Sequence, residues 1–193
     1  MKKINKGLIL TIIVLAILTI YLIGLENQRK ADKEEIKDTI SKIADITSQM
    51  VVYPEDMQRL DKEITKEQKE KYEKEIKEKL EEIMIENEEA VDLQHKVIIT
   101  NLENGNKNGE IRTKFNRNIK KIKGYEFNGE QVTVSFQSNI EEEFKYNDDI
   151  LNEEKVRKNN FDTSYGEVTL KKVDGKWKMV YSNLQYSNSM MYF

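Results

Sequence analysis

One uncharged stretch near the start of the chain constrains its fold more than any other feature. From Gly7 to Leu25, nineteen consecutive residues carry no charged side chain, and most of them are Leu or Ile. As an α-helix this stretch would extend roughly 28 Å, close to the about 30 Å hydrocarbon core of a bilayer. Because the stretch is apolar on all sides, it resembles a membrane span more than a helix with one buried face. The sequence therefore predicts a transmembrane helix at residues 7–25.

The flanks of this segment favour a retained anchor over a cleaved signal peptide. A signal peptide has an apolar core of roughly 7–15 residues followed by a cleavage site between small residues. Here the apolar stretch is longer, and the LIGLENQRK that closes it offers no such site. Lys2, Lys3 and Lys6 precede the stretch without an acidic neighbour, so the positive-inside rule places the N-terminus in the cytoplasm. We expect a cytoplasmic tail at residues 1–6, a signal anchor at 7–25, a linker at 26–31 and an extracytoplasmic domain at 32–186, with cleavage as the alternative.

Composition limits what the outer domain can do. The chain contains no cysteine, which excludes disulfides, thiolate metal sites and a lipid attached to an N-terminal cysteine. The formal net charge of -3 is not the balance of a nucleic-acid-binding protein. A six-residue inner tail is too short for a sensor or kinase module, so we expect the function to lie outside the membrane. The abundance of Lys, Asn, Ile and Glu indicates an AT-rich genome and a Gram-positive bacterium.

Helix signals dominate the first part of the outer domain. A capping pattern at Asp32 starts an apolar series with helical spacing that ends before Pro54. A second capping box begins at Thr65, and the apolar stripe after it runs from Tyr72 to Val91. A partner helix or coiled coil would use such a stripe. The pattern favours a solvated helix packed on a sheet instead, because the heptads are not sustained.

Strand and turn signals follow. Residues 97–99 are predicted as a short strand or a helix end, and residues 101–110 as a loop. Asn128-Gly129 and Asp174-Gly175 predict two hairpin turns. The expected strands lie at residues 119–127, 131–146, 161–173 (or 165–173) and 176–186, and residues 147–160 are expected as a polar connection. Helices followed by a meander predict an α+β fold, with two or three helices on a curved antiparallel sheet of about four strands.

The end of this domain resembles a known superfamily. The hairpin Val168–Lys172, Asp174-Gly175 and Lys176-Trp177-Lys178, together with Tyr125–Gly129 before the preceding strand, is similar to the nuclear transport factor two-like (cystatin-like) superfamily over roughly residues 32–186. The resemblance implies a cone between helix and sheet, with Trp177 filling the space between them. Bitopic assembly proteins of conjugation and type IV secretion machines are similar in layout: a short inner end, one span and an outer domain of this fold. They imply a scaffold that contacts other envelope proteins and itself.

The sequence offers few candidates for chemistry. His95 is the only histidine, and a lone histidine is more often a surface or capping residue than a general base. Glu141, Glu142 and Glu143 could bind a cation, but such a run more often forms a solvated edge strand. No nucleophile elbow, Walker loop or HExxH motif is present. We therefore expect no enzyme activity, no metal and no cofactor.

The C-terminal residues 187–193 allow two interpretations. Met190, Met191, Tyr192 and Phe193 form an apolar tip that either contacts a partner, or packs back onto the domain or frays. The overall expectation is a membrane-anchored, non-catalytic interaction or assembly module of a Gram-positive envelope, conjugation or secretion complex. The alternative is an envelope domain that binds a small molecule in the cone.

Overall fold

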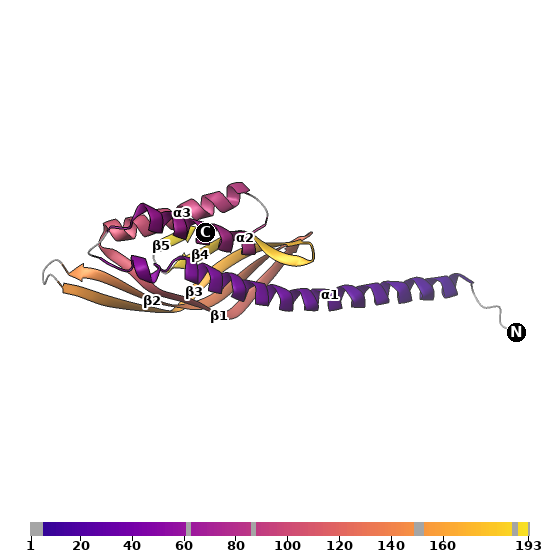
Figure 1. The fold of residues 1–193 in the computed structure, drawn as a ribbon. Coiled ribbons are helices and arrows are strands. Elements are labelled where there is room, and N and C mark those ends of the chain that lie inside the picture. The colour runs from indigo at the N-terminus through magenta and orange to yellow at the C-terminus, as the bar shows by residue number, and fades with distance from the viewer. Residues whose placement is uncertain (1–5, 61–62, 86–87, 149–152, 187–188, 193) are drawn as a thin grey trace. The chain divides into compact units, whose positions relative to one another are not determined.

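The computed structural model describes residues 6–60, 63–85, 88–148, 153–186 and 189–192. The chain forms two compact units, one up to Asp38 and one from Thr39 onward. The elements follow in the order α1, η1, α2, α3 and five β-strands (Figure 1). This order confirms the predicted α+β fold, because a long apolar helix precedes two more helices and an antiparallel sheet.

Helix α1 extends without a break over Lys6–Met50. The expected span at residues 7–25 lies inside it, and so do the residues 26–31 that were expected as a linker. The expected helix start at Asp32 is wrong, because the residues around it are good helix formers and continue the helix that arrives from the membrane segment. The end of α1 at Met50, shortly before Pro54, agrees with the prediction.

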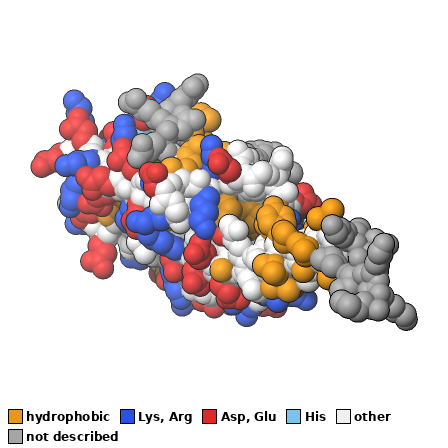
Figure 2. All heavy atoms as spheres, turned by 90° about the vertical axis from the view of Figure 1, so that its right-hand side faces the viewer, with side chains coloured by type: hydrophobic (Ala, Val, Ile, Leu, Met, Phe, Trp, Pro, Cys, Tyr) orange, Lys and Arg blue, Asp and Glu red, His pale blue; other side chains and the backbone are white. Residues whose placement is uncertain are grey.

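The N-terminal part of α1 is apolar and exposed. Its large apolar side chains from Leu10 to Ile23 are 49–70% exposed, so no face of this segment is buried by the protein. Figure 2 shows hydrophobic side chains gathered on this segment, whereas charged side chains of both signs cover much of the rest of the face. Among the described residues, α1 is the one helix that is long and apolar enough to cross a membrane.

Helix α2 (Lys66–Ile83) starts at the predicted capping box. The backbone N–H of Gln68 donates to Oγ1 of Thr65 (3.2 Å), and the N–H of Thr65 donates to Oε1 of Gln68 (3.0 Å). Its buried face consists of Tyr72, Ile76, Leu80 and Ile83. The predicted stripe does not continue to Val91 in the same helix, because α2 ends at Ile83 and a separate helix α3 covers Glu88–Lys107.

Helix α3 includes residues that were expected to leave the helical state. Residues 97–99 lie in its interior, and the loop expected at 101–110 is helical up to Lys107. The helix propensity of residues 101–107 is low, since the segment is rich in Asn and contains Gly105. Tertiary contacts compensate: Leu102 is buried, and its carbonyl accepts a hydrogen bond from the hydroxyl of Tyr53.

The sheet is a meander in sequence order, with each strand antiparallel to the next. Three of its strands are longer than expected: β1 begins nine residues before the predicted start, and residues 147–148 and 153–160 of the expected polar connection belong to β2 and β3. Residues 149–152 of that connection lie outside the described residues. Ion pairs across the β2–β3 hairpin, such as Lys158–Glu143 (3.0 Å) and Lys145–Glu154 (3.1 Å), stabilise this charged segment as strand. The bounds are β1 Glu110–Asn128, β2 Gln131–Asp148, β3 Glu153–Val173, β4 Lys176–Tyr186 and β5 Ser189–Tyr192.

Both predicted hairpin turns are present with distinct geometries. Gly129 and Glu130 join β1 to β2, and only the glycine has a positive φ (+61°), as in a type II′ turn. Asp174 and Gly175 join β3 to β4, and both have positive φ (49° and 79°), as in a type I′ turn. The first turn lies one residue later than the expected Asn128-Gly129, because Asn128 pairs with Gln131 as the last residue of β1, whereas the second turn lies at the expected residues.

One face of the sheet carries the core. Alternate residues of β2, including Val132, Val134 and Phe136, are buried, and Leu170 of β3 and Met179 of β4 continue this inner face. Helices α2 and α3 lie over the sheet (Figure 1). The last turns of α1 add Ile40, Ile43 and Met50 to the buried set.

Backbone groups from the helical layer cover parts of both sheet edges. On the β1 side, the N–H of Tyr53 donates to the carbonyl of Arg112 (3.0 Å). On the β4 side, the N–H of Ile85 donates to the carbonyl of Met179 (2.9 Å). Such contacts satisfy edge groups that would otherwise be free to pair with another strand.

Candidate functional site

Cations and aromatic rings alternate on the inner face of the sheet near the start of β1. The guanidinium carbon of Arg112 lies 5.3 Å from the ring centre of Phe115 and 4.9 Å from that of Phe144. On the same ring of Phe144, the guanidinium carbon of Arg157 lies at 5.1 Å, and it lies 5.9 Å from the ring of Tyr146. These distances are typical of cation–π contacts. Three adjacent strands thus contribute to a single stack.

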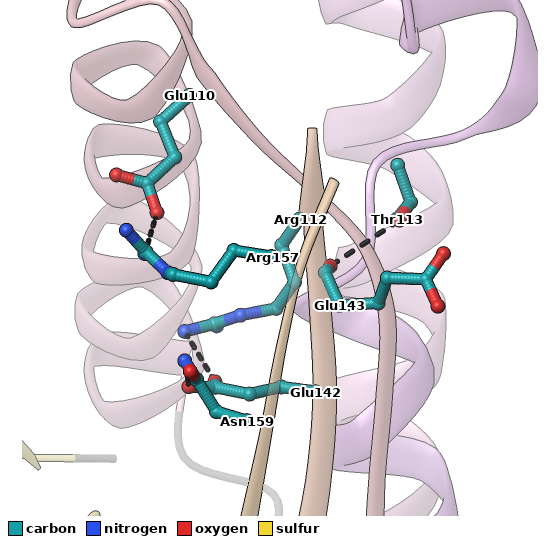
Figure 3. A network of polar contacts seen from close by, with 7 residues as sticks. All are labelled: Glu110, Arg112, Thr113, Glu142, Glu143, Arg157 and Asn159. Atoms are coloured by element: carbon teal, nitrogen blue, oxygen red, sulfur yellow. Dashed lines mark hydrogen bonds and ion pairs between the residues drawn. The ribbon is translucent and has the colours of Figure 1, made fainter. Parts of the chain in front are cut away.

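Two carboxylates pair with the two arginines of this stack, as Figure 3 shows for Glu110 with Arg157 and Glu142 with Arg112. Glu142 pairs with Arg112 at 3.4 Å and accepts a hydrogen bond from the amide of Asn159 at 2.9 Å. Glu110 pairs with Arg157. The side chains of Arg112 and Glu142 are only 13% and 9% exposed, so this pair lies largely out of water. The four charges sum to zero, which limits the electrostatic cost of burying them.

A cavity of about 220 Å³ lies beside this network, between α3 and the sheet. Its walls are mainly apolar, with Val51, Ile98, Leu102 and Phe144 as the larger apolar groups. Glu110 and Arg112 bring charges of both signs to the same wall, and Asn101 and Asn108 add neutral amides. The cavity therefore combines an apolar interior with a small number of convergent polar groups, as ligand sites commonly do.

Tyr53 and Gly105 shape one wall of this cavity. The Tyr53 hydroxyl donates to the carbonyl of Leu102. A Cβ on Gly105 would lie 2.7 Å from the Tyr53 hydroxyl oxygen and 2.9 Å from the Glu110 carbonyl oxygen. Only glycine at this position lets Tyr53 and the start of β1 approach α3 so closely.

A second, larger cavity of about 520 Å³ lies on the helical side of the domain. Its apolar lining includes Met57, Tyr72, Ile99 and Leu102. Lys69 pairs with Glu103 at 2.5 Å at this cavity, and that hydrogen bond raises the pKa of Lys69. Because the lining comes from η1 (Glu55–Met57), α2, α3 and the segment before α2, this cavity is not the cone between helix and sheet.

The residues predicted as structural lie away from both cavities. Gly129, Asp174 and Gly175 lie in the two hairpin turns, Asn128 is the last residue of β1, and none of the four lines a cavity described above. Trp177 is 9% exposed on β4, and the ammonium of Lys172 lies 5.5 Å from its ring centre.

The predicted partner-contact residues lie at the edge of the sheet. Met190, Met191 and Tyr192 belong to β5, which pairs antiparallel with β4 residues 183–186. Phe193 lies outside the described residues. The expectation that the side chains of the tail contact a partner stays a prediction.

The two candidates for chemistry lie apart from one another. His95 is half-buried in α3 and lines neither cavity. Glu141, Glu142 and Glu143 point to alternate faces of β2 and pair with Lys114, Arg112 and Lys158. The expectation that they form an edge strand is wrong, because β2 lies between β1 and β3. The described residues contain no cluster of three His, Cys, Asp or Glu residues placed to hold a metal ion.

Sequence reasoning missed Arg112 and Arg157. One signal was available: only five of the 32 basic residues are arginine, and three of these, Arg112, Arg117 and Arg157, fall on strands. Arginine stacks on aromatic rings and forms buried ion pairs more readily than lysine does. Its concentration on the sheet of a lysine-rich protein therefore indicated a special environment.

Comparison with known proteins gives little further guidance. No known protein family matches the chain, and no curated protein matches it. Among solved structures, the chain is similar to the intermembrane-space region of the chloroplast protein ARC6, with a TM-score of 0.41 and 12% identity, covering 79% of this chain and 95% of that one. This similarity is too low to establish a shared fold, so membership of the nuclear transport factor two-like superfamily stays a prediction.

Proposed function

We propose that this chain is a membrane-anchored interaction module of the bacterial envelope, with no catalytic role of its own. The segment of α1 up to Leu25 spans the membrane with its N-terminus in the cytoplasm. The α+β domain from Thr39 onward lies outside and contacts other envelope proteins. A conjugation or secretion complex of a Gram-positive bacterium is the setting that fits the layout.

The exposed apolar segment of α1 is the observation that carries this proposal. Its side chains from Leu10 to Ile23 are at least 49% exposed, and burying such a surface in lipid is strongly favourable. The residues that follow form a domain with its own buried core. An anchor joined to such a domain is the architecture of a module that presents a binding surface at the membrane.

The absence of cysteine makes the topology straightforward to test. Single cysteines are introduced at Lys3 and, on the exposed face of α2, at Lys71. Intact cells are then treated with a membrane-impermeant maleimide. We expect labelling at position 71 only, with position 3 labelled after lysis. Labelling of position 3 in intact cells would contradict the proposed orientation. Release of the protein from the membranes by alkaline carbonate would contradict the proposed membrane anchor.

Cross-linking in the producing cell tests the interaction itself. A photo-reactive residue at exposed positions of the outer domain, such as Lys71 and Tyr165, should capture other envelope proteins or a second copy of the chain. A position within the apolar segment, such as Leu15, reports contacts inside the membrane and is the matched comparison. A chain that stays monomeric and captures no protein at any position of the domain would refute the assembly role.

A second candidate function is the binding of a small molecule, and the two cavities favour it. The larger measures about 520 Å³ and the smaller about 220 Å³. The smaller cavity lies between α3 and the sheet, in the region where the superfamily resemblance implies a cone. Binding of a small molecule by the purified chain, measured calorimetrically, tests this function independently of any protein partner.

A further inference from the structure

The guanidinium group of Arg112 makes few polar contacts for its degree of burial. Guanidinium groups carry five N–H donors. Within the described residues, Arg112 has one ion pair, with Glu142 at 3.4 Å, and its Nε is buried without a hydrogen-bond partner. A distance of 3.4 Å exceeds that of a good charge-assisted hydrogen bond, which is about 2.7–2.9 Å. The group can therefore gain hydrogen bonds from an added acceptor.

The same residue lines the 220 Å³ cavity, so such an acceptor could come from a ligand. The guanidinium carbon of Arg112 lies 5.3 Å from the ring centre of Phe115 and 4.9 Å from that of Phe144. This stacking restricts the rotamers of Arg112 before any ligand arrives, and preorganisation of this kind lowers the entropic cost of binding. Arg112 is thus a fixed cation beside an apolar cavity.

The charges around the cavity select the kind of ligand. Arg112 and Arg157 are balanced by Glu142 and Glu110. An added carboxylate alone would leave a net negative charge in a region that is largely out of water, which is unfavourable. An added amine alone would leave a net positive charge. A ligand with one charge of each sign keeps the balance.

The spacing of the two charged wall residues fits such a ligand. Glu110 and Arg112 are two residues apart on β1, so they lie on one face of the sheet roughly 7 Å apart along the strand. A carboxylate and an ammonium on the same carbon could face both side chains at once. The apolar part of the ligand would then lie against Val51, Ile98 and Leu102.

We infer that this cavity binds a free α-amino acid with a medium-sized apolar side chain. The carboxylate accepts hydrogen bonds from Arg112, the ammonium faces Glu110, and the side chain fills the apolar interior. This inference rests on the second candidate function, small-molecule binding, and assigns it a site and a ligand class. It does not depend on a protein partner.

Isothermal titration calorimetry on the full chain in lipid nanodiscs tests the ligand class. The probes are L-leucine, 4-methylpentanoate, which lacks the ammonium, and isopentylamine, which lacks the carboxylate. We expect saturable binding of leucine and at least about tenfold weaker binding of each analogue, because each loses a charge-assisted hydrogen bond. Equal affinity for leucine and 4-methylpentanoate would overturn the inference, and so would no binding of leucine.

Two cavity-filling variants locate the site. Ile98→Phe places a larger side chain in the 220 Å³ cavity without touching a charged residue, and Leu60→Phe does the same in the 520 Å³ cavity. We expect the first to weaken leucine binding by tenfold or more and the second to leave it unchanged, with circular dichroism showing that both fold. The reverse result would overturn the inference while leaving small-molecule binding intact. Arg112→Lys, which keeps the charge but loses the planar donor group, should also weaken leucine binding.

Discussion

The hydroxyl of Ser48 in α1 accepts a hydrogen bond from the backbone N–H of Arg117 in β1, at 3.3 Å. The same hydroxyl donates to the carbonyl of Ala44 at 2.6 Å, so it joins the end of α1 to the edge strand of the sheet. Both residues are buried. A side chain on the helix thus satisfies a buried strand amide, at a strand edge where such groups would otherwise need water.

Replacing Ser48 by alanine should therefore destabilise the domain by about 1–2 kcal/mol, since the Arg117 N–H would lose its partner in a buried position. The free energy of unfolding, measured by urea titration in detergent micelles, checks this. Ser41→Ala in the same helix is the control, because Ser41 is exposed and its replacement should change stability by less than about 0.5 kcal/mol. Equal effects of the two substitutions would show that the hydrogen bond between Ser48 and the Arg117 N–H contributes nothing to the free energy of unfolding.

Gly105→Ala should destabilise the domain by about 1–3 kcal/mol through overpacking. The new Cβ would lie 2.7 Å from the Tyr53 hydroxyl oxygen and 2.9 Å from a backbone carbonyl oxygen, so either Tyr53 or β1 must move. Gly124→Ala is the matched control, because no heavy atom lies within 4 Å of its added Cβ. The melting temperatures of the two variants, compared in one buffer, test this prediction. An unchanged melting temperature for Gly105→Ala would mean that Tyr53 and β1 do not approach Gly105 so closely.

Gly129→Ala should cost about 1–2 kcal/mol for a different reason, which is backbone strain. Gly129 has φ +61° and nothing within 4 Å of an added Cβ, so space is not the limit there. Gly129→Asn should recover part of the loss, because asparagine tolerates positive φ better than alanine does. Chemical denaturation of the parent protein, Gly129→Ala and Gly129→Asn separates backbone strain from crowding. An asparagine variant no more stable than the alanine variant would argue against backbone strain at this position.

Tyr72 should make the stability of the protein depend on alkaline pH. Its hydroxyl lies 2.8 Å from the carbonyl of Met50 and 2.9 Å from that of Val52, and burial raises the pKa of Tyr72 above its ordinary value. The unfolded chain then loses this proton near the ordinary tyrosine pKa of about 10, whereas the folded protein retains it. The resulting stabilisation is complete below pH 10 and is lost progressively as the pH rises above it.

Unfolding titrations of the parent protein and Tyr72→Phe between pH 8 and pH 11 test this linkage. The variant should be less stable at pH 8, since two carbonyls lose their donor, but its stability should fall less steeply above about pH 10. Parallel curves for the two proteins across this range would contradict the raised pKa of Tyr72.

Local signals in the sequence identified several elements correctly. Helix α2 begins at the capping box predicted at Thr65, and the glycines of the two hairpins lie in turns that require positive φ. These features could be predicted because their chemistry involves neighbouring residues only. The candidate site could not be predicted in the same way, because Arg112, Phe144 and Arg157 lie on three strands, and only the pairing of these strands brings two guanidinium groups to one ring.

The sequence by itself determined the apolar N-terminal helix, the α+β order and the two hairpin turns, because charge, period and turn chemistry act over a few residues. Tertiary structure decided where the elements end. The Asn-rich end of α3 is helical because Leu102 is buried and its carbonyl accepts the Tyr53 hydroxyl. The charged ends of β2 and β3 are strands because residues such as Glu143 and Lys158 pair across the hairpin. Contacts between distant residues outweigh weak local preferences at such places, and no local pattern records them.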